Sequence, residues 1–212
     1  MGTDDQINTL SRLFRVSHET ISSLKKYEKL LIKANNSLNL IGKSTLNQIW
    51  NRHFIDSFQV IDFIDKSNNS LIDMGSGAGF PGMVLAIAAK DKNIPIKITL
   101  VEKSKKKANF LNDIKNELNL NVHVICKNIL NDNEKLTSQV FVARAFKPFE
   151  IILELIHNKI ENFEKFFVFL GKTGSRDLLQ ASKNWDIKYK QRMSITSNDS
   201  FIIEINKLEK IN

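Results

Sequence analysis

Four closely spaced glycines and one acidic residue form the part of the chain that is best suited to chemistry. Gly75, Gly77, Gly79 and Gly82 lie within eight residues, and Asp73 stands two positions before the first of them. Glycine allows backbone conformations that are closed to other residues, and it lets a ligand approach the main chain closely. A helix that begins after such a loop points free N–H groups toward the ligand. The stretch therefore predicts a loop that binds a nucleotide-like molecule.

Two motif templates fit this loop. Gly77-x-Gly79-x-x-Gly82 matches the dinucleotide fingerprint, which places a pyrophosphate at a helix N-terminus. Asp73-x-Gly75-x-Gly77-x-Gly79 matches the first motif of class I S-adenosylmethionine-dependent methyltransferases. That cofactor has no phosphate but carries a sulfonium and an ammonium, and a carboxylate suits such cations better than a pyrophosphate. A third interpretation is that the glycines only build a tight turn between a strand and a helix.

A second acidic residue, Glu102, lies 20 positions after Gly82. In Rossmann-type sheets the second strand presents a carboxylate to a ribose at about this distance from the glycine loop. The two oxygens of one carboxylate can accept hydrogen bonds from both ribose hydroxyls. Glu102 is compatible with either cofactor, and the alternative is a solvated glutamate at the end of a strand.

The elements around these residues alternate between strand and helix. The glycine loop leads into a predicted helix over residues 81–90, and Ser104 is a predicted cap for the next helix. Two further helices are predicted at 151–156 and 175–182. Strands are predicted at 71–74, 96–101, 122–125, 140–143 and 166–170, followed by an antiparallel pair at 187–193 and 201–207. We expect an α/β fold with a mostly parallel sheet and an antiparallel C-terminal edge.

Helical periodicity dominates the N-terminal part of the chain. Helices are predicted over residues 4–16, from a cap at Ser17 to about residue 36, and from a cap at Ser44 to residue 61. Some 65 residues are too few for a separate domain of typical size. We expect a helical cap (1–65) on a cofactor-binding sheet (66–212), together forming a single domain over residues 1–212.

The bulk composition excludes several classes of protein. The chain has 212 residues, of which 42% are hydrophobic and 25% charged, as in ordinary globular proteins. No apolar run approaches the ~20 residues that a membrane helix needs, and no signal peptide opens the chain. One cysteine, Cys126, cannot form an intramolecular disulfide, so we expect a cytoplasmic protein. With four histidines besides, no metal site is expected.

The net charge favours a polyanionic partner. Lysine and arginine total 31 against 23 acidic residues, which gives a formal charge of +8. Each phosphate contact releases counterions and so adds affinity for nucleic acid. The alternative is an AT-rich genome that enriches lysine, asparagine and isoleucine. Composition alone does not distinguish these two explanations of the positive charge.

The ordered set of motifs resembles one family, the bacterial small-subunit ribosomal RNA guanine-N7 methyltransferases, also called the glucose-inhibited division protein B family. The matching stretches span residues 39–172 and are Asn39-Leu40, Arg52-His53-x-x-Asp56-Ser57, Ile72-Asp73-x-Gly75-x-Gly77-x-Gly79-x-Pro81-Gly82, Glu102-x-Ser104-x-x-Lys107, Phe110-Leu111 and Ala143-Arg144-Ala145-Phe146. The Arg-His-x-x-Asp-Ser motif, placed before a Gly-Phe-Pro-Gly loop, is far more specific than either glycine template.

The resemblance implies a class I methyltransferase with a Rossmann-like sheet. It would act as a monomer and transfer a methyl group from S-adenosylmethionine to N7 of one guanine in 16S ribosomal RNA of the small ribosomal subunit. It implies that Arg144 is the one candidate for a catalytic role, and that Arg52, Lys107 and Lys172 contact RNA. The cofactor is expected to contact Asp73, Gly75, Ser76, Gly77, Gly79, Phe80, Asn128, Ile129 and Arg144, with Glu102 on the ribose.

The implied chemistry needs no general base. Guanine N7 carries an in-plane lone pair and no proton, so catalysis rests on alignment of the reactants, which can lower a barrier by ~7–11 kcal/mol. The chain departs from the family after the third strand. The family has a carboxylate near the adenine there, whereas this sequence has Lys127-Asn128-Ile129.

Other functions remain open on the sequence. The enzyme could methylate another RNA, a small molecule or a protein, it could be an NAD-dependent oxidoreductase, or it could be an RNA-binding domain without activity. Among the remaining residues, Trp50 and Trp185 are expected to pack in the core, and Cys126 to be a small buried side chain. His53 is expected to hold the helical cap against the glycine loop.

Overall fold

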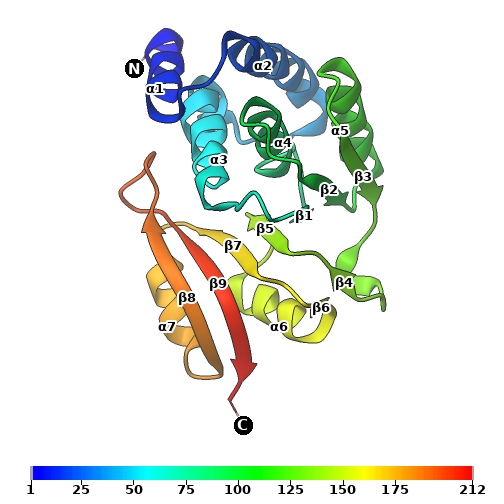
Figure 1. Cartoon of the computed structure of the whole chain (residues 1–212), viewed down its shortest axis with the longest axis vertical. Coiled ribbons are helices and arrows are strands. Elements are labelled where there is room, and N and C mark those ends of the chain that lie inside the picture. Colours follow the sequence, from blue (N-terminus) through cyan, green and yellow to red (C-terminus); the bar gives the residue numbers. More distant parts are fainter. Residues whose placement is uncertain (1, 212) are drawn as a thin grey trace.

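The protein is built on one large twisted sheet. The computed structural model describes residues 2–211, and within this range the large sheet has seven strands in the order β3-β2-β1-β5-β7-β9-β8 (Figure 1). The strands are β1 (Ser70–Met74), β2 (Lys97–Glu102), β3 (Val122–Cys126), β5 (Val140–Arg144), β7 (Lys165–Leu170), β8 (Trp185–Met193) and β9 (Phe201–Lys210). The first five named are parallel, and β9 is antiparallel to both of its neighbours. The predicted mostly parallel sheet with an antiparallel C-terminal edge is confirmed.

The order of the strands identifies the edge where a ligand is expected. The chain runs outward from β1 to β2 and β3, then returns to β5 on the other side of β1. Open α/β sheets bind ligands at such a switch point, beyond the carboxyl ends of the strands. A separate small sheet pairs β4 (Leu136–Thr137) with β6 (Ile160–Glu161). The sequence did not predict these strands because two residues carry no periodic signal.

Helices cover both faces of the sheet. One face carries α4 (Gly82–Asp91) and α5 (Lys105–Glu117), and the other carries α6 (Phe149–Lys159) and α7 (Gly174–Ala181) (Figure 1). Successive strand residues alternate between these faces: Val142 packs with α4 and α5, whereas Phe141 packs with α6. Helix α4 is buried from its first residue to Ala89 because it lies between the sheet and the N-terminal helices.

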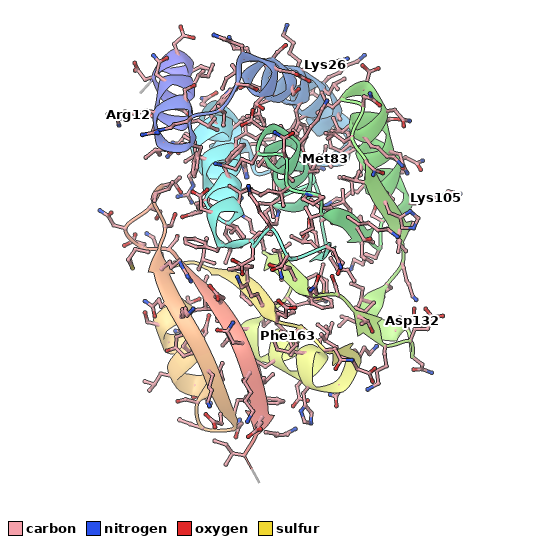
Figure 2. The ribbon with its side chains drawn as sticks, in the orientation of Figure 1. Arg12, Lys26, Met83, Lys105, Asp132 and Phe163 are labelled. Atoms are coloured by element: carbon pink, nitrogen blue, oxygen red, sulfur yellow. The ribbon has the colours of Figure 1, made fainter. Side chains whose placement is uncertain are left out.

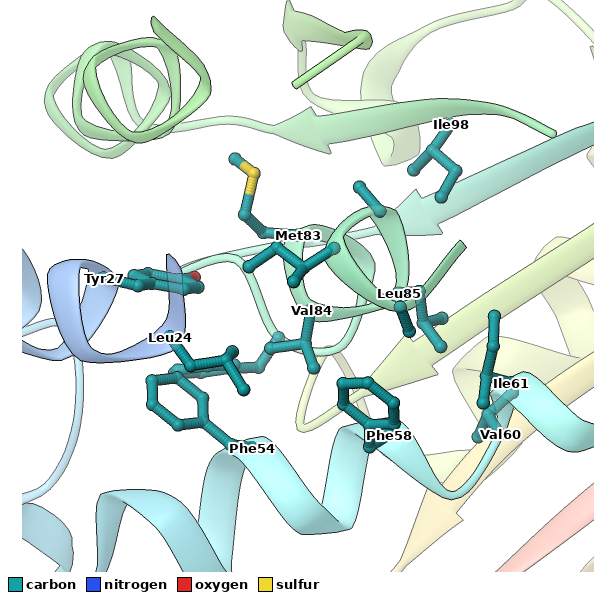
Figure 3. Packing of buried hydrophobic residues seen from close by; sticks show 14 of the residues in the cluster. Leu24, Tyr27, Phe54, Phe58, Val60, Ile61, Met83, Val84, Leu85 and Ile98 are labelled. Atoms are coloured by element: carbon teal, nitrogen blue, oxygen red, sulfur yellow. The ribbon is translucent and has the colours of Figure 1, made fainter. Parts of the chain in front are cut away.

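The N-terminal helices form a layer over α4 (Figure 1). They are α1 (Thr3–Phe14), α2 (His18–Leu38), the 3₁₀ turn η1 (Lys43–Gln48), the π-helical turn η2 (Trp50–Ile55), α3 (Asp56–Phe58) and the 3₁₀ turn η3 (Ile61–Phe63). Figure 3 shows Leu24 and Tyr27 of α2, with Phe54 and Phe58 below, directed at Val84 and Leu85 of α4. The predicted cap at Ser17 is confirmed, since its side chain accepts from the backbone of Thr20 at 3.2 Å.

Three predictions about local structure are not met. Ser104 stands at the N-cap of α5, but its side chain makes no capping hydrogen bond. Ser44 does not cap a helix, because the 3₁₀ turn already begins at Lys43 and places Ser44 inside it. Cys126 is exposed rather than buried, because it ends β3, which is the edge strand of the sheet. The prediction for the tryptophans is confirmed: Trp50 and Trp185 are each 1% exposed.

Candidate active site

A cavity of about 460 Å³ opens at the carboxyl edge of the sheet, above β1, β2 and β5. A volume of this size suits a cofactor or another small molecule. Its walls come from the glycine loop, the start of α5, the turn after β3 and the segment after β5. The cavity brings together most of the residues predicted from the sequence, namely Gly75, Ser76, Gly77, Phe80, Glu102, Lys107, Asn128, Ile129 and Arg144. Asp73, Gly79, Arg52 and Lys172 are not among its lining residues.

Glu102 joins the glycine loop to the start of α5. Its Oε2 accepts a hydrogen bond from the backbone N–H of Gly77 at 2.9 Å, and its Oε1 accepts from that of Ser104 at 2.8 Å. The residue is 6% exposed, and it lines the cavity. Each carboxylate oxygen has a further lone pair, so both can still accept a hydrogen bond from a ligand hydroxyl. The side chain is therefore fixed in place before a ligand binds.

The conformation of the loop depends on Gly75 and Gly79. Gly75 has φ +73°, and a Cβ there would lie 2.1 Å from the ring of Phe146, which also lines the cavity. Gly79 has φ +99°, and a Cβ there would lie 2.3 Å from the hydroxyl of Tyr27. That hydroxyl donates to the carbonyl of Ala78 at 2.5 Å, so α2 holds the loop from behind. Gly79 thus faces the helical cap, away from the predicted cofactor contact.

Asp73 lies beneath the loop and not in the cavity. It is fully buried, and its Oδ2 accepts from the backbone N–H of Gly82, the first residue of α4, at 3.0 Å. Burial raises the pKa of Asp73 to about 7, against the lowering effect of the hydrogen bonds from Gly82 and Ser76. In this structure the carboxylate is directed toward the N-terminus of α4, and the contact with the cationic groups of the cofactor stays a prediction.

Phe80 and His53 connect the loop to the N-terminal layer. Their rings stack with centroids 4.8 Å apart and planes 18° from parallel, and His53 Nε2 lies 3.0 Å from Thr45 Oγ1. Burial, together with the charges of Arg144 and Arg52, lowers the pKa of His53 to about 3. The expected role of His53 between the cap and the loop agrees with these contacts, although the ring also lines the cavity.

The pKa of His53 gives a testable dependence of stability on pH. The folded protein binds the proton at about pH 3, whereas the unfolded chain binds it at about 6.5, so stability is lost as the pH falls below 6.5. Between pH 6.5 and 5.0 the loss from this one residue is about 2 kcal/mol. We expect His53→Gln to remove that part of the pH dependence in urea unfolding, while His18→Gln, at an exposed position, leaves it unchanged. Equal slopes for wild type and His53→Gln would contradict this assignment.

The turn after β3 forms another wall of the cavity. Ile129 and Leu130 open the 3₁₀ turn η4 (Ile129–Asn131), and Asn128 accepts from the backbone of Leu130 at 3.2 Å. Lys159 of α6 donates to the carbonyls of Ile129 and Leu130 at 2.8 and 2.9 Å, and also to that of Asp132. A lysine that the motifs did not single out therefore fixes this wall from behind. No short motif could have identified it, because its partners lie about 30 residues earlier.

Lys127, the first residue after β3, also lines this wall. Its ammonium pairs with Asp132 and, at 2.5 Å, with Glu134. The charge of this cavity-lining lysine is thus balanced within its own turn. The wall consequently offers main-chain groups, apolar side chains and the Asn128 amide to a ligand.

Arg144 ends β5 and is held by three partners from the N-terminal layer. It pairs with Asp56 at 3.0 Å, donates to Ser57 Oγ at 3.3 Å, and donates to the carbonyl of Arg52. The side chains of Arg144 and Asp56 are 17% and 13% exposed. Burial lowers the pKa of Arg144, and the charge of Asp56 acts in the opposite direction. The family motifs Arg-His-x-x-Asp-Ser and Ala-Arg-Ala-Phe thus meet in space, across almost 90 residues.

The three residues predicted to contact RNA lie at different places. Lys107 lines the cavity, Arg52 is exposed beside it, and Lys172 is an 84% exposed side chain 3.6 Å from Asp199. Figure 2 shows Lys105 on the outside of α5, and this lysine is exposed. Lys103, Lys107, Lys127 and Lys147 line the cavity, whereas Arg52 and Lys172 lie outside it, so the predicted residues do not form a compact patch.

The structure of residues 2–211 offers neither a cluster of metal ligands nor a membrane-spanning helix. No group of three or more His, Cys, Asp or Glu side chains in residues 2–211 could hold a metal ion. Over the same range, every helix is too short or too polar to cross a membrane.

The walls of the cavity fit S-adenosylmethionine. Glu102 offers two carboxylate oxygens that face the cavity and still have free lone pairs. Gly75 and Gly77 place bare backbone along one side, and Ile129 gives an apolar surface on another. A nucleoside with a short polar tail requires hydrogen-bond acceptors for its ribose, space against the backbone and an apolar surface for its base.

Comparison of the fold places the protein in a broad class. M. capricolum TrmK, solved in complex with S-adenosyl-homocysteine, aligns with a TM-score of 0.53 and 20% sequence identity over 71% of this chain and 67% of that one. Together with the strand order, this likeness identifies the architecture as the Rossmann-like fold of class I methyltransferases, as the sequence predicted.

Comparison of the sequence identifies the family within that class. The family model for rRNA small subunit methyltransferase G (GidB) matches residues 20–203. Ribosomal RNA small subunit methyltransferase G of Pelagibacter ubique is 38% identical over 93% of this chain and 93% of its own. The protein of that name from Rickettsia felis is 34% identical over 94% of this chain and 100% of its own. The chain belongs to the rRNA small subunit methyltransferase G family, and the family predicted from the motifs is confirmed.

Proposed function

We propose that the protein transfers a methyl group from S-adenosylmethionine to N7 of a guanine in 16S ribosomal RNA. The observation that carries this proposal is the cavity at the switch point of the sheet, in which the glycine-loop backbone, Glu102 and Arg144 meet. Membership of the family named for small-subunit rRNA methylation supports the acceptor class. The positive residues around the opening suit a polyanionic acceptor.

The chemistry asks the protein for alignment more than for proton transfer. When bound, the cofactor supplies a methyl group that the N7 lone pair accepts, while the electron pair of the broken C–S bond stays on sulfur and S-adenosylhomocysteine is left. No proton leaves the guanine, so no base is needed. This agrees with His53, whose low pKa keeps it neutral and whose Nε2 is engaged by Thr45.

Each wall of the cavity has a part in this proposal. Glu102 accepts from the ribose hydroxyls, and the backbone from Gly75 to Gly77 lies along the cofactor. Asn128 and Ile129 contact the adenine. Arg144, fixed by Asp56, orients the reacting groups at the boundary between cofactor and acceptor. Gly79 and Asp73 act indirectly, by shaping the loop from behind.

The geometry also weighs against the dinucleotide interpretation. A pyrophosphate would require free N–H groups at the N-terminus of α4. The N–H of Gly82 is already bound to Asp73, and both residues are buried. A phosphate placed there would have to displace a carboxylate within the core.

Ligand-dependent thermal unfolding tests the choice of cofactor. At 100 times its dissociation constant a ligand stabilises the folded state by about 2.7 kcal/mol. For a chain of this length we expect S-adenosylhomocysteine to raise Tm by about 5–10 °C. NAD at the same concentration should leave Tm unchanged. The reverse pattern would favour the oxidoreductase.

The finer features of the function are also proposals. We propose that the enzyme acts as a monomer, and that it acts on the small ribosomal subunit in the cytoplasm. Within a single domain the N-terminal layer would serve as part of the site, because it supplies Tyr27, His53 and Asp56 to the loop and to Arg144.

A further inference from the structure

A second cavity, of about 310 Å³, lies directly beside the first. The two share Arg144 and Ala145 as walls, so a molecule in the second cavity would adjoin a ligand in the first. The remaining walls come from η2 and α3, from the end of β7, and from the hairpin loop, which we define as residues 194–200 between β8 and β9. None of the sequence motifs pointed to this hairpin loop.

The topology puts the hairpin loop at the edge of the sheet where the cofactor cavity opens. Leu170, the last residue of β7, pairs with Phe201, the first residue of β9. The loop that precedes β9 therefore lies beyond the carboxyl end of β7, next to that of β5. Figure 1 shows it close to the helix labelled α3, as its contacts with Asp56 require.

One carboxylate holds both the hairpin loop and the arginine. Asp56 Oδ1 accepts from Ser194 Oγ at 2.9 Å and from Thr196 Oγ1 at 3.0 Å, while its Oδ2 pairs with Arg144 at 3.0 Å. Gln59, one turn further along, donates to the same Oδ1 at 2.8 Å and accepts from the backbone of Ile195. Asp56 therefore holds both Arg144, which lines both cavities, and the hairpin loop, which lines the second cavity.

The chemistry of the walls suits a flat heterocycle with polar edges. The hydroxyls of Thr196 and Ser200 can donate or accept hydrogen bonds. Phe169 offers an aromatic surface and lies 5.6 Å from the guanidinium of Arg144. Arg52 is exposed at the rim, where the phosphates flanking a nucleotide would lie. Bases that are taken out of a stack are held by such aromatic, guanidinium and hydrogen-bonding groups.

We propose that the second cavity receives the acceptor purine, turned out of the RNA, and that the hairpin loop positions it against Arg144. This inference rests on the function proposed above. N7 then forms its bond to the methyl carbon where the two cavities adjoin, beside Arg144 and Ala145, while the C–S bond breaks with its electron pair staying on sulfur and the purine gains the positive charge. The hairpin loop determines acceptor binding and has no part in cofactor binding.

Two glycines allow the two cavities to be filled separately. Gly171 lines the second cavity, and a Cβ there would meet no atom within 4 Å. Gly42 lines the first, and a Cβ there would meet only Ser44 Oγ, at 3.8 Å. Neither glycine has a positive φ, so both positions accept larger residues without backbone strain. Gly171→Phe and Gly42→Leu are therefore a matched pair of variants.

The test measures RNA methylation and cofactor affinity for each variant. For Gly171→Phe we expect kcat/KM for small subunits to fall about 100-fold, with the dissociation constant for S-adenosylhomocysteine within about threefold of wild type. For Gly42→Leu we expect a loss of cofactor affinity. Retained cofactor affinity reports that Gly171→Phe is folded. If it does not fold, Ser200→Leu, in the same cavity, is expected to give the same pattern.

Three results would overturn the inference. If wild type methylates RNA and the folded Gly171→Phe and Ser200→Leu variants methylate it equally well, the acceptor does not use this cavity and the inference is wrong. If Gly171→Phe loses cofactor affinity as strongly as Gly42→Leu, the two cavities are one site and the inference is again wrong. If wild type binds S-adenosylhomocysteine but methylates no RNA, the proposed function itself fails and takes the inference with it.

Discussion

Replacing Glu102 with alanine is expected to weaken S-adenosylhomocysteine binding about 100-fold. The variant loses two hydrogen bonds from ribose hydroxyls to a carboxylate, at about 1.5–3 kcal/mol each. It also leaves the N–H groups of Gly77 and Ser104 without their partner, so the loop and the start of α5 are no longer joined. A loss of about 3 kcal/mol corresponds to about 100-fold in the dissociation constant. Isothermal titration calorimetry measures it directly.

Two further variants make this result specific. Glu102→Gln keeps the shape and one carbonyl oxygen, so we expect an intermediate loss of affinity. Glu209→Ala removes the same charge from an exposed position on β9, and we expect affinity equal to that of wild type. An affinity of Glu102→Ala close to that of wild type would show that Glu102 does not hold the ribose.

Replacing Arg144 with alanine is expected to lower both stability and the rate of methyl transfer. The variant leaves Asp56 partly buried without its cationic partner, which costs about 3 kcal/mol. It also removes a side chain that lines both cavities. We expect the resulting loss of alignment between cofactor and acceptor to lower single-turnover methylation about 100-fold. Urea unfolding and single-turnover assays with saturating cofactor measure the two effects separately.

The stability effect and the rate effect have different controls. Asp56→Asn combined with Arg144→Ala should recover part of the lost stability, because no uncompensated carboxylate then remains, but none of the rate. Arg176→Ala, at a 79% exposed side chain on α7, should change neither quantity. Full methylation by Arg144→Ala would remove Arg144 from the reaction.

The sequence predicted the parts of the fold whose signals are local. Apolar runs located the strands of the large sheet, and alternating residues located the β8–β9 hairpin. The spacing of glycines located the loop, and the position of Glu102 after it located the second acidic group in the cavity. These signals succeed because each depends on residues close together in the chain.

The features that the sequence did not predict depend on how the chain is arranged in space. Asp73 matched its motif, but the motif could not tell that its carboxylate accepts a hydrogen bond from the backbone of Gly82 beneath the loop. The hairpin loop is a run of small polar residues, which is typical of a solvated turn. Its association with Asp56 spans 138 residues, from Asp56 to Ser194, and only the folded chain shows it. The edge position of Cys126 likewise follows from strand order, which no local pattern encodes.

The most direct test of the central claim is to locate the methyl group. Small subunits from cells that lack this enzyme are incubated with the protein and isotopically labelled S-adenosylmethionine, and the 16S ribosomal RNA is digested to nucleosides. We predict that the label appears in 7-methylguanosine, at a single position in the RNA, and that Glu102→Ala abolishes it at limiting cofactor. Label in another nucleoside, or none in RNA when the protein binds the cofactor, would contradict the account.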